Sequence, residues 1–101
     1  MEFSGFDWDE ANRDKCRKHG VSIAEIESLF GGSVVILPDA DHSQTERRFR
    51  AIGRTSTGRV VFVVFTERSH GQDMKIRPIS ARYMHRKEAR NYEETYPELQ
   101  D

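Results

Sequence analysis

Residues 46–68 place the strongest restriction on the fold, because they have the pattern of two β-strands joined by a tight turn. Between residues 46 and 55 the character of the side chains alternates with the two-residue period of a strand. One face then carries Phe49, Ala51 and Gly53, and the other carries Arg48, Arg50, Ile52 and Arg54. Turn-forming residues occupy 55–58, and residues 59–68 have the apolar character of a strand buried on both faces in its middle. The segment therefore predicts a hairpin at the centre of a sheet, with one basic face.

Two helices are predicted before this hairpin. Residues 9–19 contain no proline or glycine, and Asp7 followed by Glu10 is an acceptable N-terminal cap. The second helix has a stronger signal, because Ser22 and Glu25 form a capping box and two glycines follow its last apolar residues. Both helices come from the N-terminal third of the chain.

Two further strands flank the hairpin in the sequence. Residues 33–37 are a β-branched run that a proline closes, and residues 39–45 after them form a polar loop. On the other side, a glycine-containing loop over residues 69–73 leads into a strand over residues 74–81. Pro78 interrupts this strand and is easier to place at a sheet edge or a bulge.

The last predicted helix begins at Arg82 or just after it, carries Ala89 and Tyr92 on one face, and stops at Pro97. A chain of 101 residues has the size of one domain with one core, so we expect a single domain over residues 1–101. The predicted class is α+β, with an antiparallel sheet of three to four strands packed by two N-terminal helices and one C-terminal helix.

Charge is divided unevenly along the chain, although the formal net charge is only −1. Residues 47–90 carry twelve basic and three acidic residues, a net charge of +9, whereas residues 1–46 have a net charge of −6. A field of this kind is local, because salt screens it over about 10 Å, and it attracts a polyanion such as nucleic acid. The alternative is that the two parts neutralise each other across the fold.

Several classes of protein are excluded or disfavoured. Cys16 has no second cysteine to pair with and the N-terminus lacks the pattern of a signal peptide, so a cytoplasmic protein is expected. The longest apolar run, residues 60–65, is far shorter than the roughly 20 residues of a membrane-spanning helix. No phosphate-binding glycine loop or serine elbow is present, and no cofactor is expected. Cys16 and His19 lie three residues apart, but two ligands are weak evidence for a metal.

Arginines near strand ends, with a histidine at a helix end, remain as candidates for chemistry. Cleaving RNA without a metal needs a base, an acid and fixed cations at the phosphate. Arg68 and Arg82 suit the last role, provided that the strand register brings them together. His19 suits proton transfer, or else it only caps the helix.

Two expectations about these arginines can be checked in a structure. The two-residue period of a strand places Phe62, Val64, Thr66 and Arg68 on one face of their strand. By the same period, Ile76, Ser80 and Arg82 lie on one face of the next strand. Glu67 and Glu88 are the obvious partners if the arginines form only surface ion pairs.

Seven short motifs, in the right order and over nearly the whole chain, resemble the BrnT toxin family. They are Phe6-Asp7-Trp8-Asp9, Lys18-His19-Gly20-Val21, Glu46-Arg47-Arg48 with Ala51-Ile52-Gly53-Arg54, Thr57-Gly58-Arg59-Val60, Val64-Phe65-Thr66-Glu67-Arg68, Ile79-Ser80-Ala81-Arg82, and a helix with Lys87-Glu88 and Tyr92. The resemblance implies a RelE-like fold, a ribonuclease that cleaves RNA and suppresses translation, and a BrnA-like ribbon-helix-helix antitoxin. Operator DNA would then be contacted only through the antitoxin, and no membrane is involved.

The resemblance also implies functional residues. Lys18, His19, Arg68 and Arg82 are the expected catalytic residues, with no metal. Arg48 and Tyr92 are expected to contact RNA, and the basic strand face adds Arg50 and Arg54. The sequence departs from the family at His85, where relatives usually have Thr or Ser to cap the last helix. A non-catalytic basic module that binds an antitoxin or nucleic acid is the alternative function.

Overall fold

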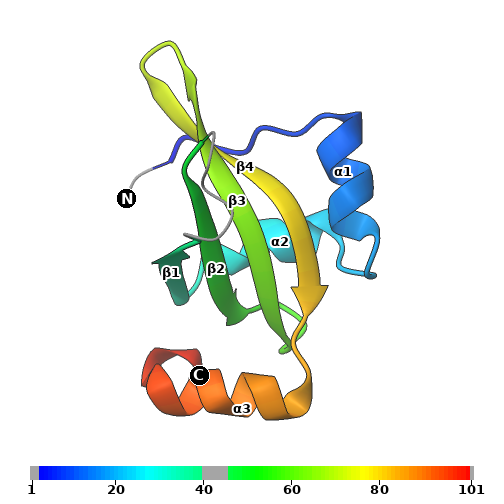
Figure 1. Ribbon diagram of the computed structural model, residues 1–101, viewed down its shortest axis with the longest axis vertical. Helices are drawn as coiled ribbons and strands as arrows, with labels where there is room; N and C mark the ends of the chain where they lie inside the picture. Colours follow the sequence, from blue (N-terminus) through cyan, green and yellow to red (C-terminus); the bar gives the residue numbers. More distant parts are fainter. Residues whose placement is uncertain (1–2, 40–45, 101) are drawn as a thin grey trace.

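The computed structural model describes residues 3–39 and 46–100. Its centre is an antiparallel sheet in the order β1-β2-β3-β4, with strands Val34–Pro38, Arg48–Arg54, Val60–His70 and Asp73–Tyr83. Helices α1 (Glu10–Arg17) and α2 (Ile23–Leu29) precede the sheet, and α3 (Arg86–Thr95) and the short 3-10 helix η2 (Pro97–Gln100) follow it (Figure 1). The predicted α+β class with three helices is therefore confirmed, and the sheet has four strands. None of the described helices has the length and apolar character needed to cross a membrane.

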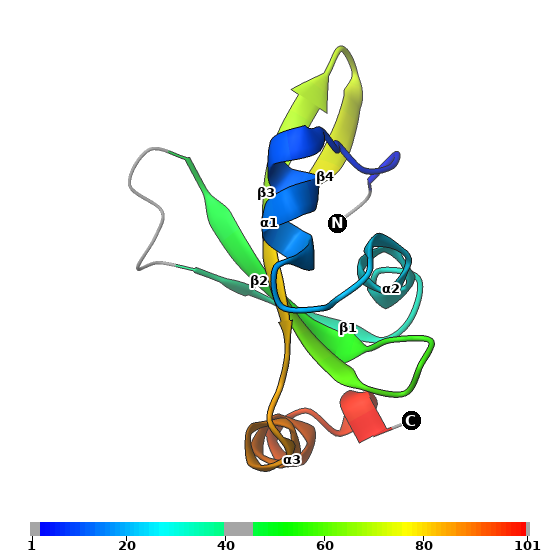
Figure 2. The same ribbon diagram turned by 90° about the vertical axis from the view of Figure 1, so that its right-hand side faces the viewer.

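The predicted hairpin is the middle of the sheet. Arg50 lies opposite Val64 and Ala51 opposite Val63, so the faces of β2 and β3 agree. On one face, buried residues of both strands pack against α2; these are Phe49, Ala51, Val61, Val63 and Phe65, with Ile26 and Leu29 of the helix. In Figure 1, α2 passes behind the sheet, and Figure 2 shows it on one side of the strands. This is the main core.

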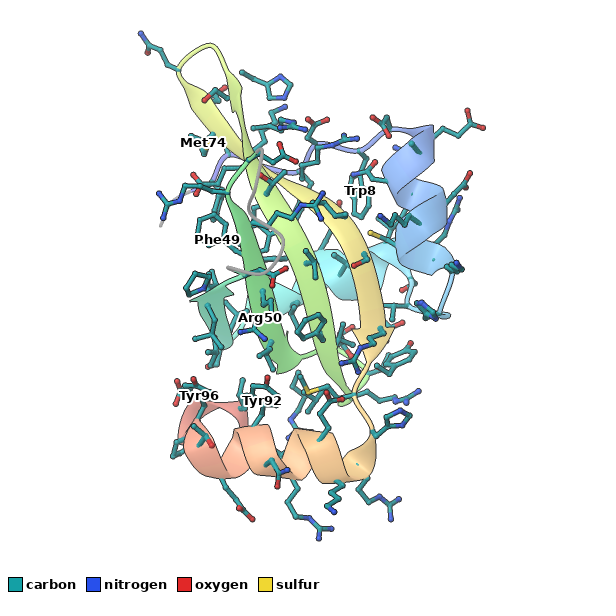
Figure 3. The ribbon with its side chains drawn as sticks, in the orientation of Figure 1. Trp8, Phe49, Arg50, Met74, Tyr92 and Tyr96 are labelled. Atoms are coloured by element: carbon teal, nitrogen blue, oxygen red, sulfur yellow. The ribbon has the colours of Figure 1, made fainter. Side chains whose placement is uncertain are left out.

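The C-terminal elements pack against one end of the opposite face. Val35, Ile52, Val60, Met84 and Leu99 form a second, smaller buried cluster there. Tyr92 and Tyr96 lie on the side of α3 that faces the sheet (Figure 3) and pack against this cluster. Since α3 and η2 lie beneath the lower end of the strands (Figure 1), the described helices leave the rest of this face uncovered. We call the uncovered part the open face.

The caps of the first two helices differ in how well they were predicted. The capping box of α2 is confirmed, since Ser22 and Glu25 each accept a hydrogen bond from the other's backbone N–H. The predicted cap of α1 by Asp7 is wrong, because Asp9 is the N-cap and forms its capping box with Asn12. Asp7 instead belongs to an extended segment alongside β4, where its N–H donates to the carbonyl of Ile76 at 2.8 Å.

The predicted loop over residues 69–73 is wrong. Strands β3 and β4 continue to His70 and Asp73, which are paired, so that only Gly71 and Gln72 form the turn. Gly71 has φ of +64°, a conformation that glycine adopts without strain and that suits a tight hairpin turn. The predicted loop over residues 39–45 lies, apart from Asp39, outside the described residues.

Strand β4 contains the bulge that Pro78 suggested. Val64 pairs with Ser80 but the next residue, Phe65, pairs with Pro78, so Ile79 is an extra residue. The predicted grouping of Ile76 with Ser80 and Arg82 is therefore wrong, because the bulge reverses the faces on either side of it. Ile76 lies in the main core at 2% exposure, whereas Ser80 lines the open face.

Candidate functional site

Cationic side chains from two elements meet on the open face. Arg48 and Arg50 of β2 and Lys15 of α1, together with Ser80 of β4, line a hollow of about 390 Å³. Phe62 and Val64 of β3 also line it, as do Ile79 and Asp39. We call it the central hollow. Arg50 is drawn on β2 in Figure 3, next to Phe49 of the opposite face.

The electrostatics of the central hollow favour an anion. Its lining contains three cationic side chains and a single carboxylate, Asp39. The Nε atom of Arg50 is buried, and no hydrogen-bond acceptor within residues 3–39 and 46–100 reaches it. The excess of cationic side chains over carboxylates in the lining favours the binding of an anion.

A second hollow, of about 640 Å³, lies where β4 meets α3. It is lined by Arg82, His85, Lys87, Glu88, Asn91 and Tyr92, and we call it the terminal hollow. The Arg82 guanidinium lies 5.0 Å from the centre of the Phe62 ring, and Phe62 lines the central hollow. Arg82 therefore lines the terminal hollow and lies beside a residue that lines the central hollow.

Arg82 is held in place by Glu88. Its Nη1 and Nη2 atoms donate to Oε1 and Oε2 of Glu88 at 2.9 and 3.0 Å. These hydrogen bonds lower the pKa of Glu88 and raise that of Arg82. Glu88 is therefore ionised at neutral pH and orients the guanidinium rather than donating a proton.

Two other residues of the terminal hollow have chemical uses. His85 is exposed and is the N-cap of α3, but its side chain makes no capping hydrogen bond, which fits its departure from the usual Ser or Thr. The half-buried Tyr92 ring is stacked with Tyr96, with centroids 6.3 Å apart and planes 15° apart. A fixed aromatic ring at the edge of a basic surface can stack with a nucleobase.

The register separates the two arginines that were expected to act together. Arg82 lies opposite Phe62, whereas Arg68 lies opposite Lys75, six residues further along β3 and thus about 20 Å away. Arg68 donates to Glu46 at 2.6 Å, not to the expected Glu67. The expected partnership of Arg82 with Glu88 is present.

Arg54 serves the fold in this structure. Its guanidinium donates to the carbonyls of Leu99 and Gly58 at 3.0 and 2.7 Å, and to Glu93 at 2.7 Å. These bonds tie β2 to α3 and η2, and they leave Arg54 few donors for a ligand.

Lys18 and His19 lie in the exposed turn that follows α1. They line neither the central nor the terminal hollow. The turn is next to Tyr83, whose hydroxyl oxygen lies 3.5 Å from the carbonyl oxygen of Gly20. The structure thus brings together Arg48, Arg50, Arg82 and Tyr92, and it does not bring Lys18 or His19 to them.

Sequence reasoning missed Lys15 and Ser80. Lys15 lies one helical turn before Lys18, and it reaches the open face because α1 packs along β4. The period of a strand placed Ser80 on the same face as Arg82, but Ser80 was not named as a site residue. No signal in the sequence shows where α1 docks.

The cysteine and histidine considered for a metal do not form a centre. Cys16 is fully buried, and burial raises the pKa of its thiol to about 11, while His19 is exposed. In the part of the chain that the structure describes, no three side chains of the metal-binding types lie together.

Comparison with known proteins identifies the family. No match was found among curated proteins. The family model described as the ribonuclease toxin BrnT of a type II toxin–antitoxin system matches residues 8–88, a range that includes all four strands, Arg82 and Glu88. Proteins of such systems act with an antitoxin, so the family implies this partner. The chain belongs to the BrnT family of ribonuclease toxins.

Proposed function

We propose that this chain is a metal-independent endoribonuclease whose cleavage of RNA inhibits translation, and that the central and terminal hollows bind the RNA. The observation that carries the proposal is the position of Arg82 in the terminal hollow and beside Phe62 of the central hollow, with its fork held by Glu88. The excess of cationic side chains in the central hollow also supports it.

In the proposed reaction, the 2′-hydroxyl oxygen of the RNA attacks the adjacent phosphorus. A base takes the hydroxyl proton, the bond from phosphorus to the 5′-oxygen breaks, and an acid gives that oxygen a proton. Negative charge grows on the phosphate oxygens in the transition state, where a preorganised guanidinium is most effective. Arg82 has this role in our proposal, because its orientation is already set before RNA binds.

Neighbouring residues bind the flanking RNA. Arg48, Arg50 and Lys15 hold phosphates in the central hollow, and Tyr92 stacks with a base. Arg68, at the far end of β3, is an outlying RNA contact, and Arg54 supports the end of the sheet.

Three residues are candidates for proton transfer. His85 lies in the same hollow as Arg82, and histidine is the side chain most often used for general acid–base catalysis, which favours it. His19 and Lys18 stay candidates on the family resemblance alone. The dependence of the cleavage rate on pH in His85→Ala and His19→Ala decides between the histidines. Only the variant that lacks the histidine that transfers the proton loses one arm of the bell-shaped rate profile.

The antitoxin in this proposal is a BrnA-like ribbon-helix-helix protein. It would cover the basic hollows and carry the toxin to operator DNA. An antitoxin that blocks RNA binding but still binds the Arg82→Ala variant would fit this arrangement.

The test is cleavage of a labelled RNA in excess chelator by the wild type and by Arg82→Ala. Arg17→Ala is the matched control, because among the described residues Arg17 pairs with Asp14 alone, on the exposed side of α1. We expect the wild type and the control to cleave, and Arg82→Ala to lose about 10²–10³ in rate, the usual effect of removing one transition-state contact. Arg82→Lys separates the effect of charge from that of geometry, because lysine keeps the positive charge but lacks the planar guanidinium with its paired N–H donors.

Three results would contradict the proposal. Full activity of a folded Arg82→Ala variant would remove Arg82 from the site, and cleavage that needs an added metal would refute metal independence. RNA binding with a steep salt dependence but no cleavage would identify a binding module instead.

A further inference from the structure

A third basic surface lies on the other side of the start of α3. It is a cleft of about 720 Å³ between the β2–β3 turn, the end of β4 and α3. Arg59, Arg86 and Arg90 line it, and we call it the arginine cleft. The RNA-binding residues expected from the sequence do not include these three arginines.

The arginine cleft has an excess of positive charge. Arg59, Arg86 and Arg90 are exposed, and none of them forms an ion pair with a residue that the structure describes. The one carboxylate in the lining, Glu93, already accepts a hydrogen bond from Arg54. Three arginines without a counter-charge repel each other unless an anion lies between them.

Arg59 is held in position for such an anion. Its guanidinium lies 3.7 Å from the centre of the Tyr83 ring, and the Tyr83 hydroxyl is fixed by a 2.7 Å hydrogen bond to Glu25. A guanidinium stacked on an aromatic ring keeps its N–H groups at its edges, where they can donate to phosphate oxygens.

Arg86 and Arg90 are four residues apart, so they lie on one face of α3. Like charges at this spacing destabilise a helix. Nothing in the described fold uses these two cations, which favours a role in binding.

The arginine cleft is adjacent to the proposed catalytic site. His85 lines both this cleft and the terminal hollow that contains Arg82. A strand of RNA whose phosphate sits at Arg82 would pass His85 on its way to the arginine cleft.

We infer that the arginine cleft binds phosphates of the single-stranded RNA that flanks the cleaved bond. The inference rests on the proposed function and extends it, since it predicts a substrate longer than the two hollows can hold. Phosphate contacts in the cleft add to the affinity for RNA but not to the preference for a sequence, because the phosphates are the same in every RNA.

The test compares two RNAs, a short one and a longer one that extends past the catalytic site in both directions. Both carry 2′-O-methyl groups, which block attack by the 2′-oxygen and allow binding to be measured alone. The variant is Arg86→Gln with Arg90→Gln, two exposed positions, and Arg13→Gln is the control, an exposed arginine of α1 outside all three basic surfaces.

We expect the wild type and the control to bind the longer RNA more tightly, and the double variant to lose this gain. For the longer RNA, the slope of log affinity against log salt should fall by about 0.7 for each phosphate contact removed. The inference would be overturned if the double variant still bound the longer RNA more tightly than the short one, with an unchanged salt slope. Equal losses of affinity for the short and the longer RNA would overturn it as well.

Two further outcomes are distinguishable. If the wild type binds neither RNA, the proposed function fails, and the cleft assignment fails with it. If the double variant binds both RNAs normally but no longer binds the antitoxin, the cleft is a protein interface and its assignment to RNA is wrong.

Discussion

Replacing Glu25 with alanine is expected to destabilise the fold strongly, because this one carboxylate connects three elements. Glu25 is 9% exposed and lies in the first turn of α2. Its Oε1 accepts hydrogen bonds from the Ser22 N–H at 3.2 Å and the Tyr83 hydroxyl at 2.7 Å, and its Oε2 accepts one from the Thr57 hydroxyl at 3.0 Å. The start of α2, the β2–β3 turn and the end of β4 thus share one anchor.

The expected loss can be worked out from these contacts. A hydrogen bond to a charged group contributes about 1.5–3 kcal/mol, and an alanine variant loses the bonds that Tyr83 and Thr57 donate to this carboxylate. Allowing for non-additivity, we expect a loss of about 3–5 kcal/mol in the free energy of unfolding. Typical domains have only about 5–15 kcal/mol in total.

The same anchor gives a pH dependence. Burial alone would raise the pKa of Glu25, but the hydrogen bonds from Tyr83, Ser22 and Thr57 outweigh it, and the pKa is lowered from its ordinary value of 4.5. A carboxyl with a lowered folded-state pKa contributes stability that is present above 4.5 and is lost as the pH falls through the folded value. The difference between wild type and Glu25→Gln should therefore shrink in acid.

The assay is urea unfolding followed by circular dichroism. Glu27→Ala is the control on the same helix, because Glu27 is exposed and its one hydrogen bond in the structure comes from the Trp8 indole. A double-mutant cycle with Tyr83→Phe should show coupling between Tyr83 and Glu25. A loss below about 1 kcal/mol for Glu25→Ala, or no coupling, would refute the reasoning.

Two more predictions concern the main core. A Cβ atom at Gly53 would lie 2.9 Å from Leu29 Cδ1 and 3.1 Å from the Ser33 carbonyl oxygen, so Gly53→Ala should cost about 1–3 kcal/mol, and unchanged unfolding in urea would contradict this. Cys16 is fully buried, and its burial raises the thiol pKa to about 11, so a thiol reagent should react only on unfolding; rapid labelling of the folded protein at neutral pH would show that the thiol is accessible.

Local patterns in the sequence determined much of the fold. The alternation over residues 46–55 predicted the hairpin and its basic face, and the Ser22–Glu25 pair predicted the start of α2. Such features depend on neighbours a few residues apart, through the two-residue period of strands and the capping of helices. The family was also recognisable at this level, because its motifs are short and ordered.

Only the tertiary structure decided which cations share a site. The bulge at Ile79 and the pairing of β3 with β4 place Arg82 beside Phe62 and leave Arg68 far from it. The docking of α1 along β4 brings Lys15 to the open face and leaves His19 outside the hollows. Register and docking depend on contacts between residues distant in sequence, and a one-residue change in register exchanges the faces of a strand, so no local pattern could have specified them.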